Sequence, residues 1–85
     1  MAHYLVERYL PGMSEEALRS ALERLAPATT GTAVRYIGST ILVEDEACFC
    51  HFEAPSAKAV AEVNGRAGIP LDRIIAALPV APAPG

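Results

Sequence analysis

The stretch Ala47–Pro55, which reads Ala-Cys-Phe-Cys-His-Phe-Glu-Ala-Pro, has the alternation of a β-strand with two chemically different faces. Side chains alternate across a strand, so one face carries both cysteines and a phenylalanine. The other face carries Phe49, His51 and Glu53. We expect the first face to join the hydrophobic core and the second to line the functional surface.

Two elements open the chain. Residues 3–10 are rich in strand-forming types and stop at a Pro-Gly pair, a strong turn signal. Ser14 and the two glutamates after it are typical of a helix start, because the hydroxyl caps a free N–H and the acids favour the positive end of the helix dipole. We expect this helix to run to about Ala26 and to be closed by Pro27.

A strand precedes the central stretch, and a helix and a strand follow it. The β-branched and aromatic run 34–43 predicts a strand, in which Gly38 indicates a bulge or a close backbone approach. Ser56 starts the second helix and Gly68 ends it. The apolar run 74–78 predicts a short last strand.

This order predicts an α+β, ferredoxin-like βαββαβ sandwich over residues 1–78, with both helices on one face of an antiparallel sheet. Residues 79–85 form a proline-rich tail, expected to be extended and flexible. The first and third strands would be the central pair, which places Glu7 beside His51 and Glu53 on the uncovered face. Two such sheets packed face to face would give a dimeric α/β barrel enclosing a pocket.

Size and composition also favour a homodimer. A chain of 85 residues makes one domain. At this size folding buries only roughly 60 to 65% of the unfolded surface, and 52% of the residues are hydrophobic, so some apolar surface is expected to meet a second copy. The net charge of -3 and the scattered basic residues argue against nucleic acid. Without an apolar run of about 20 residues or a signal peptide, we expect a cytoplasmic protein with no membrane partner.

Three segments resemble a family of small bacterial domains of unknown function, grouped with a nickel-binding protein of dimeric, ferredoxin-like fold. The segments are Val-Glu-Arg at 6–8 leading to Leu-Pro-Gly at 10–12, Phe-Cys-His-Phe-Glu-Ala-Pro at 49–55, and Arg-Ala-Gly-Ile-Pro-Leu-Asp-Arg-Ile at 66–74. Together they are spread over nearly the whole chain, from residue 6 to residue 74, in the right order, and the resemblance implies the fold predicted above.

The resemblance also implies where nickel ligands would stand. Nickel-type members have a histidine late in the first strand and a His-x-x-x-His pair on the second helix. This chain has Arg8, Asn64 and Gly68 at those positions. The expected imidazoles are therefore absent, and nickel binding does not carry over from the resemblance by default.

The uncovered face offers two kinds of candidate site. Glu7 and His51 could act as an acid/base pair, because carboxyl and imidazole groups titrate near useful pH values. Alternatively, His51, Glu7 and Glu53 could supply nitrogen and oxygen ligands to nickel or another divalent metal. Histidine and glutamate two apart on a strand also commonly face solvent or pair with an arginine, here Arg8 or Arg35.

Aromatic side chains could line a ligand pocket between two sheets. Tyr9, Tyr36 and Phe49, together with Glu53, are the candidates, although aromatic packing at a dimer interface explains them equally well. Cys48 and Cys50 lie about 7 Å apart on one strand face if extended, at the edge of disulfide geometry, so we expect buried, reduced thiols.

No dinucleotide-binding, P-loop or zinc-protease motif occurs, so no cofactor is expected. The leading hypothesis from the sequence is a homodimer that binds a mostly apolar small molecule between its sheets, as a biosynthetic isomerase or cyclase, by analogy with other dimeric barrels. Whether any reaction is catalysed stays open. The alternative is a non-enzymatic protein that binds nickel or another divalent metal, and a third is a structural or regulatory domain without a ligand.

Overall fold

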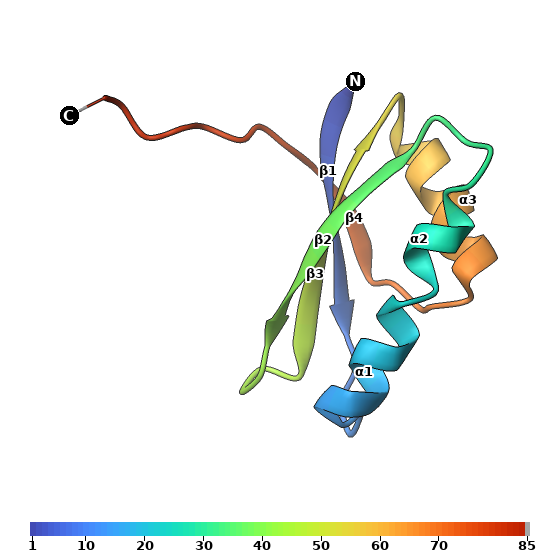
Figure 1. Cartoon of the computed structure of the whole chain (residues 1–85). Coiled ribbons are helices and arrows are strands. Elements are labelled where there is room, and N and C mark those ends of the chain that lie inside the picture. Colours follow the sequence, from blue (N-terminus) through green and yellow to red (C-terminus); the bar gives the residue numbers. More distant parts are fainter. Residues whose placement is uncertain (85) are drawn as a thin grey trace.

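The computed structural model describes residues 1–84, and Figure 1 shows helices along one side of a twisted sheet. The elements follow one another as β1 (Ala2–Tyr9), α1 (Glu15–Leu22), α2 (Leu25–Ala28), β2 (Arg35–Leu42), β3 (Ala47–Ala54), α3 (Ala57–Ala67) and β4 (Arg73–Ala77). This is the predicted ferredoxin-like order, except that the first helical segment consists of two pieces. The first, second and fourth strands each begin and end one residue away from the expected positions. The third covers residues 47–54 of the stretch 47–55 that predicts it.

The four strands lie in the order β2-β3-β1-β4, and every neighbouring pair is antiparallel. The prediction that the first and third strands form the central pair is therefore confirmed. The molecule measures 39 × 36 × 18 Å, and its short dimension is that of a sheet with one layer of helices. One face of the sheet is consequently left without a covering layer (Figure 1).

The first helix does not run to Ala26, and Pro27 does not close it. Helix α1 ends at Leu22, and Pro27 lies inside the short helix α2. Within a continuous helix the proline ring would clash with the carbonyl four residues earlier, that of Glu23, and would leave it without a hydrogen bond. The break therefore falls at Glu23 and Arg24. Pro27 becomes a first-turn residue of α2, where a missing N–H costs little.

The other local signals act as expected. The hydroxyls of Ser14 and Ser56 each accept a hydrogen bond of 3.1 Å from a backbone N–H three residues later. Gly68 ends α3 in the left-handed conformation with φ of 71°, which favours a residue without Cβ. The pairing of β2 with β3 shifts by one residue between Tyr36 and Gly38, which confirms the bulge.

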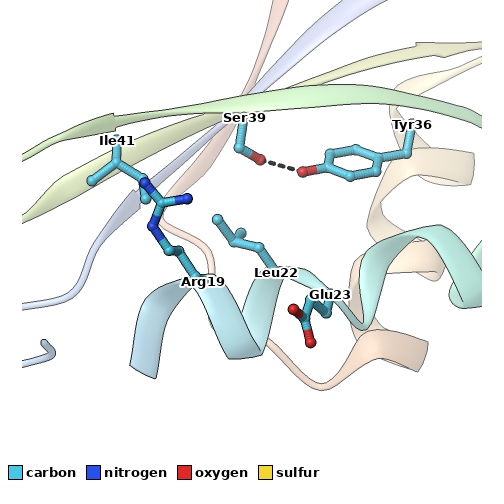
Figure 2. Close-up of a pocket in the computed structure, with 6 residues that line it drawn as sticks. All are labelled: Arg19, Leu22, Glu23, Tyr36, Ser39 and Ile41. Carbon is cyan, nitrogen blue, oxygen red and sulfur yellow. Dashed lines mark hydrogen bonds between the residues drawn. The ribbon is translucent and has the colours of Figure 1, made fainter. Parts of the chain in front are cut away.

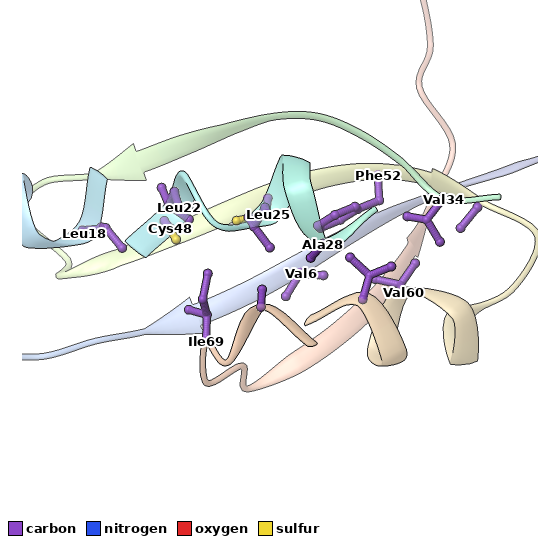
Figure 3. Close-up of a cluster of buried hydrophobic side chains, with 14 residues drawn as sticks. Val6, Leu18, Leu22, Leu25, Ala28, Val34, Cys48, Phe52, Val60 and Ile69 are labelled. Atoms are coloured by element: carbon purple, nitrogen blue, oxygen red, sulfur yellow. The ribbon is translucent and has the colours of Figure 1, made fainter. Parts of the chain in front are cut away.

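The core lies between the sheet and the helices, and Figure 3 shows its side chains pointing into this layer. From the sheet it receives Val6, Cys48, Cys50 and Phe52, each with no exposed surface. The core face of the first strand, which the sequence left undecided, is thus the face of Val6. Arg8 lies on the same face and is also fully buried.

Residues 78–84, which follow β4, have no regular structure. Leu78, expected to end the last strand, lies outside β4 and is 86% exposed. From Pro79 onward the described residues run away from the fold as an extended segment (Figure 1). Gly85, the last residue of the predicted tail, lies outside the described residues.

Candidate functional site

The uncovered face of the sheet carries most of the predicted site residues. On β1 these are Glu7 and Tyr9, and on β3 they are Phe49, His51 and Glu53. Tyr9 is 57% exposed, and the others are half-buried. The alternation therefore assigned the two faces of β3 correctly, with both cysteines and Phe52 on the core side.

Glu7 and His51 lie on the same side of the sheet but do not face each other directly. Glu7 is opposite Phe49, and His51 is opposite Leu5. They are therefore diagonal neighbours, which places their Cα atoms about 7 to 8 Å apart. The prediction that Glu7 and His51 share the uncovered face is therefore confirmed. The two side chains do not contact each other directly.

Both carboxylates of the predicted site contact arginines from the edge strands. Arg73 Nε of β4 lies 2.9 Å from Glu7 Oε1, and Arg35 Nη1 of β2 lies 3.4 Å from Glu53 Oε1. The contact also raises the pKa of Arg73, because the adjacent carboxylate favours its charged form. Of the two arginines named as possible partners, Arg35 takes that role and Arg8 does not. Within one chain these carboxylates are solvated ion pairs rather than groups directed at His51.

The two histidines of the chain lie side by side on the uncovered face. The ring centroids of His3 and His51 are 6.5 Å apart, with the rings edge to face. His51 Nε2 also lies 3.4 Å from the hydroxyl of Thr40 on β2. Both imidazoles border a shallow groove of about 330 Å³, whose other walls are Leu5, Ala77, Leu78 and Pro79. His3 was not among the residues that the sequence predicted for the site.

The predicted aromatic pocket is not formed as a unit, because Tyr36 lies on the opposite face from Phe49. Its ring packs on Phe52 in the core, with centroids 5.3 Å apart, and its hydroxyl lies 2.5 Å from Ser39 Oγ. The bulge in β2 shifts the alternation of side chains by one residue and so turns Tyr36 toward the core. Tyr9 and Phe49 remain on the uncovered face, and a role for them in ligand binding stays a prediction.

Arg8 is the centre of a buried polar cluster that the sequence reading missed. Its Nε donates to Cys50 Sγ at 3.4 Å, and its Nη1 donates to the carbonyls of Ile69 at 3.3 Å and Pro70 at 3.1 Å. Its Nη2 donates to Asn64 Oδ1. The ion pairs found among residues 1–84 involve other arginines. The guanidinium is thus a buried cation held by a sulfur and three oxygens.

The two free cysteines beside Arg8 differ in acidity. Contact with the Cys48 thiol lowers the pKa of Cys50 to about 6, and hydrogen bonds from Ser39 and Arg8 act in the same direction against the effect of burial. The same contact, followed by burial, raises the pKa of Cys48 well above its usual range. Ser39 Oγ donates to Cys50 Sγ at 3.0 Å. The pair therefore favours one thiolate and one thiol next to the guanidinium.

The positions at which the resemblance implies nickel ligands do come together, but their side chains do not suit a metal. Arg8 contacts Asn64, and Gly68 caps the same helix. A guanidinium has no lone pair to donate to a metal ion. Asn64 uses its amide N–H to donate to Val60 O at 2.8 Å. The nickel site implied by the resemblance is therefore replaced in this chain by an arginine.

Residues 1–84 also lack two kinds of feature. No cluster of three or more His, Cys, Asp or Glu side chains with metal-binding geometry occurs in this part of the chain. Glu7, His51 and Glu53 accordingly do not assemble a metal site within one subunit. No helix among the same residues is long and apolar enough to cross a membrane.

Comparisons with known proteins agree with this architecture. No curated protein matches the sequence. The structure is similar to the crystal structure of SCO4226 from Streptomyces coelicolor A3(2), with 25% sequence identity, a TM-score of 0.82, and coverage of 94% of this chain and 100% of that one. A family model described as "Nickel responsive protein SCO4226-like" matches residues 4–76. The chain therefore belongs to the family of SCO4226-like nickel-responsive proteins.

Proposed function

We propose that this protein is a non-enzymatic, metal-responsive homodimer that binds a divalent cation, nickel(II) foremost, through His3 and His51. The observation that carries the proposal is the pairing of these two imidazoles, 6.5 Å apart between ring centroids, at one groove of the uncovered sheet face. Imidazole nitrogen is a preferred ligand of nickel(II). The family description supports the same class of function.

A second copy of the chain would complete the site. Two imidazoles leave a nickel ion short of its usual coordination, and the carboxylates nearest to them already contact arginines. The uncovered face also carries half-buried apolar residues on both central strands, among them Leu5 and Phe49. Packing two such faces together would remove this surface from water and bring a second imidazole pair to the interface.

The test is calorimetric titration of metal-stripped protein with nickel chloride and zinc chloride. We expect micromolar nickel binding that is lost in both His3→Ala and His51→Ala. Glu53→Gln is the matched control, because it alters the same face but removes only a carboxylate already paired with Arg35. Binding that persists in both histidine variants would contradict the proposal. Light scattering should give a mass twice the 9.0 kDa of one chain.

The isomerase or cyclase hypothesis with Glu7 and His51 as acid and base stays a prediction. Its geometry requires these diagonal neighbours to act on a ligand held between two sheets. A structure of the dimer with its sheets packed solidly at Glu7 would contradict it.

A further inference from the structure

Within the core, Arg8 lies next to two cysteine side chains on β3. Cys48 and Cys50 have no exposed surface, and neither does Arg8. A buried charge is costly unless an opposite charge or strong hydrogen bonds compensate it. Among residues 1–84 the carboxylates in ion pairs serve Arg19, Arg35 and Arg73. The cysteine sulfurs are therefore the groups that can supply a negative charge beside Arg8.

We propose that Cys48 and Cys50 form a binding site for a soft monovalent metal ion, copper(I) in chemical class, in which Arg8 and the ion together balance the charge of two thiolates. This site is separate from the proposed imidazole site, since it lies on the other face of β3. Thiolate sulfur is the ligand type that selects copper(I) over harder ions.

Charge balance determines the valence of the ion. Two thiolates carry two negative charges, and Arg8 and one monovalent cation carry two positive charges, so the loaded site is neutral. A divalent ion in the same place would leave one uncompensated positive charge in a fully buried position, which is unfavourable. Binding breaks each S–H bond that is still present, releases that proton to solvent and forms two sulfur–metal bonds. No electron is transferred, because the ion enters as copper(I).

The spacing of the cysteines suits a bridging ion better than a disulfide. Residues two apart on a strand have Cα atoms about 7 Å apart, at the upper limit for a disulfide. Metal–sulfur bonds of about 2.3 Å, as in zinc thiolates, would hold two sulfurs roughly 4.6 Å apart with the ion midway. Side chains on the same strand face can reach this separation without moving the backbone.

A groove between α1 and the edge strand β2 leads toward the sulfurs. It has a volume of about 390 Å³, and Figure 2 shows Tyr36 and Ser39 of β2 pointing into it opposite Leu22 of α1. Ser39 Oγ lies 3.0 Å from Cys50 Sγ, so this hydroxyl separates the groove from the sulfur. Helix α1 contributes only Leu18 and Leu22 as buried residues. A small outward movement of this helix would open a path for an ion.

The first test is anaerobic titration with copper(I), delivered as its bicinchoninate complex and followed by loss of the complex's colour. We expect one copper(I) per chain, and at least a 100-fold loss of affinity in Cys48→Ser and in Cys50→Ser. His51→Ala should bind copper(I) as the native chain does, while Cys50→Ser should keep its nickel binding. These paired controls separate failure of this inference from failure of the proposed function.

A measurement on the native chain covers the case in which a cysteine variant fails to fold. X-ray absorption of the copper-loaded protein should show two sulfur neighbours around copper. Nitrogen or oxygen neighbours instead, or full copper(I) affinity in the folded cysteine variants, would overturn the proposal.

The role of Arg8 has its own test in metal selectivity. Arg8→Lys keeps the positive charge, and Arg8→Met removes it. We expect Arg8→Met to shift the ratio of copper(I) to cadmium(II) affinity toward cadmium by at least 10-fold, because a divalent ion then neutralises the two thiolates. Arg8→Lys should keep the native preference. An unchanged ratio in folded Arg8→Met would contradict the charge argument.

Discussion

Glu7 and Arg8 are adjacent on β1, yet they show how differently the two faces of one sheet treat a charge. Glu7 points to the uncovered face, where it contacts Arg73. The Arg73 side chain is 65% exposed. Arg8 points into the core, has no exposed surface and satisfies its hydrogen bonds with Asn64, Cys50 and two carbonyls. Water can replace the partner of the first residue but not those of the second.

The contacts on the uncovered face can rearrange, whereas those of the Arg8 cluster are fixed. On the uncovered face, ion pairs link central strands to edge strands and can rearrange when a ligand or a second copy arrives. On the covered face, the Arg8 cluster joins β1 to β3, to α3 and to the loop before β4. The core cluster is therefore tied to the fold itself, whereas the ion pairs of the uncovered face are not.

The largest difference in the free energy of unfolding is expected between variants of the two phenylalanines of β3. Phe52 is fully buried, so Phe52→Ala should lower the free energy of unfolding by about 3 to 5 kcal/mol through lost burial and a cavity. Phe49 lies on the uncovered face, so Phe49→Ala should act mainly on the affinity between two copies. Urea denaturation at several protein concentrations checks both. A concentration-independent loss of equal size in both variants would remove the distinction between the faces.

The next contrast is between the two charges of β1. Arg8→Met keeps the apolar volume but leaves Asn64 Oδ1 and two carbonyls without their donor, and should cost about 3 kcal/mol. Glu7→Gln should change the free energy of unfolding little, because water solvates the exposed Arg73 side chain once the carboxylate is removed. Thermal unfolding of the pair at low protein concentration measures this difference. Similar midpoints for the two variants would show that the guanidinium is not essential to the core.

An effect that is smaller per pH unit is expected from titration of the cysteines, which lie on the covered face. The folded pKa of Cys50, about 6, is below its usual value of 9.0, so the unfolded state binds more protons between these values. Stability should therefore rise from pH 6 to 9, by at most about 1.4 kcal/mol per pH unit, and the gain is lost as pH falls to 6. The raised pKa of Cys48 has the opposite sign and lowers stability above pH 9.

Denaturation curves across pH 6 to 10 in a reducing buffer test this prediction. The native chain should show a stability maximum near pH 9, and a Cys48→Ser, Cys50→Ser double variant should lose the rise between pH 6 and 9. A rise of the same size in the double variant would assign the effect to other groups.

Local signals in the sequence were sufficient for the fold. The alternation over 47–54, the serine caps and Gly68 each specify structure through neighbours within a few residues, and each is confirmed. The break in the first helical segment is also a local effect, because the ring of Pro27 excludes the carbonyl of Glu23 from a continuous helix. It was missed because the proline was taken to end the helix rather than to divide it.

The candidate site depends on contacts that a linear pattern does not contain. Arg8 meets Asn64 across 56 positions, and neither residue alone indicates a buried pair. The signal for this pair in the sequence is that Arg8 and Asn64 are polar residues on faces that otherwise point into the core. The bulge at Gly38 likewise decides which face receives Tyr36. Proximity of His3 to His51 follows from strand register, which the sequence left open on β1.

The smallest expected effect concerns the ion pair between Glu53 and Arg35 on the uncovered face. The nitrogen–oxygen distance is 3.4 Å, and the Arg35 side chain is 72% exposed, so the pair is screened by water and salt. Glu53→Gln should lower the stability of the isolated chain by less than about 1 kcal/mol, and by nothing measurable in 1 M salt.

If two copies pair through this face, the same variant should alter dimer affinity more than monomer stability, because burial would strengthen the interaction. Analytical ultracentrifugation at low and high salt, with Glu15→Gln on α1 as the matched exposed ion pair away from that face, distinguishes these outcomes. Equal effects of the two variants on self-association would place the dimer interface elsewhere.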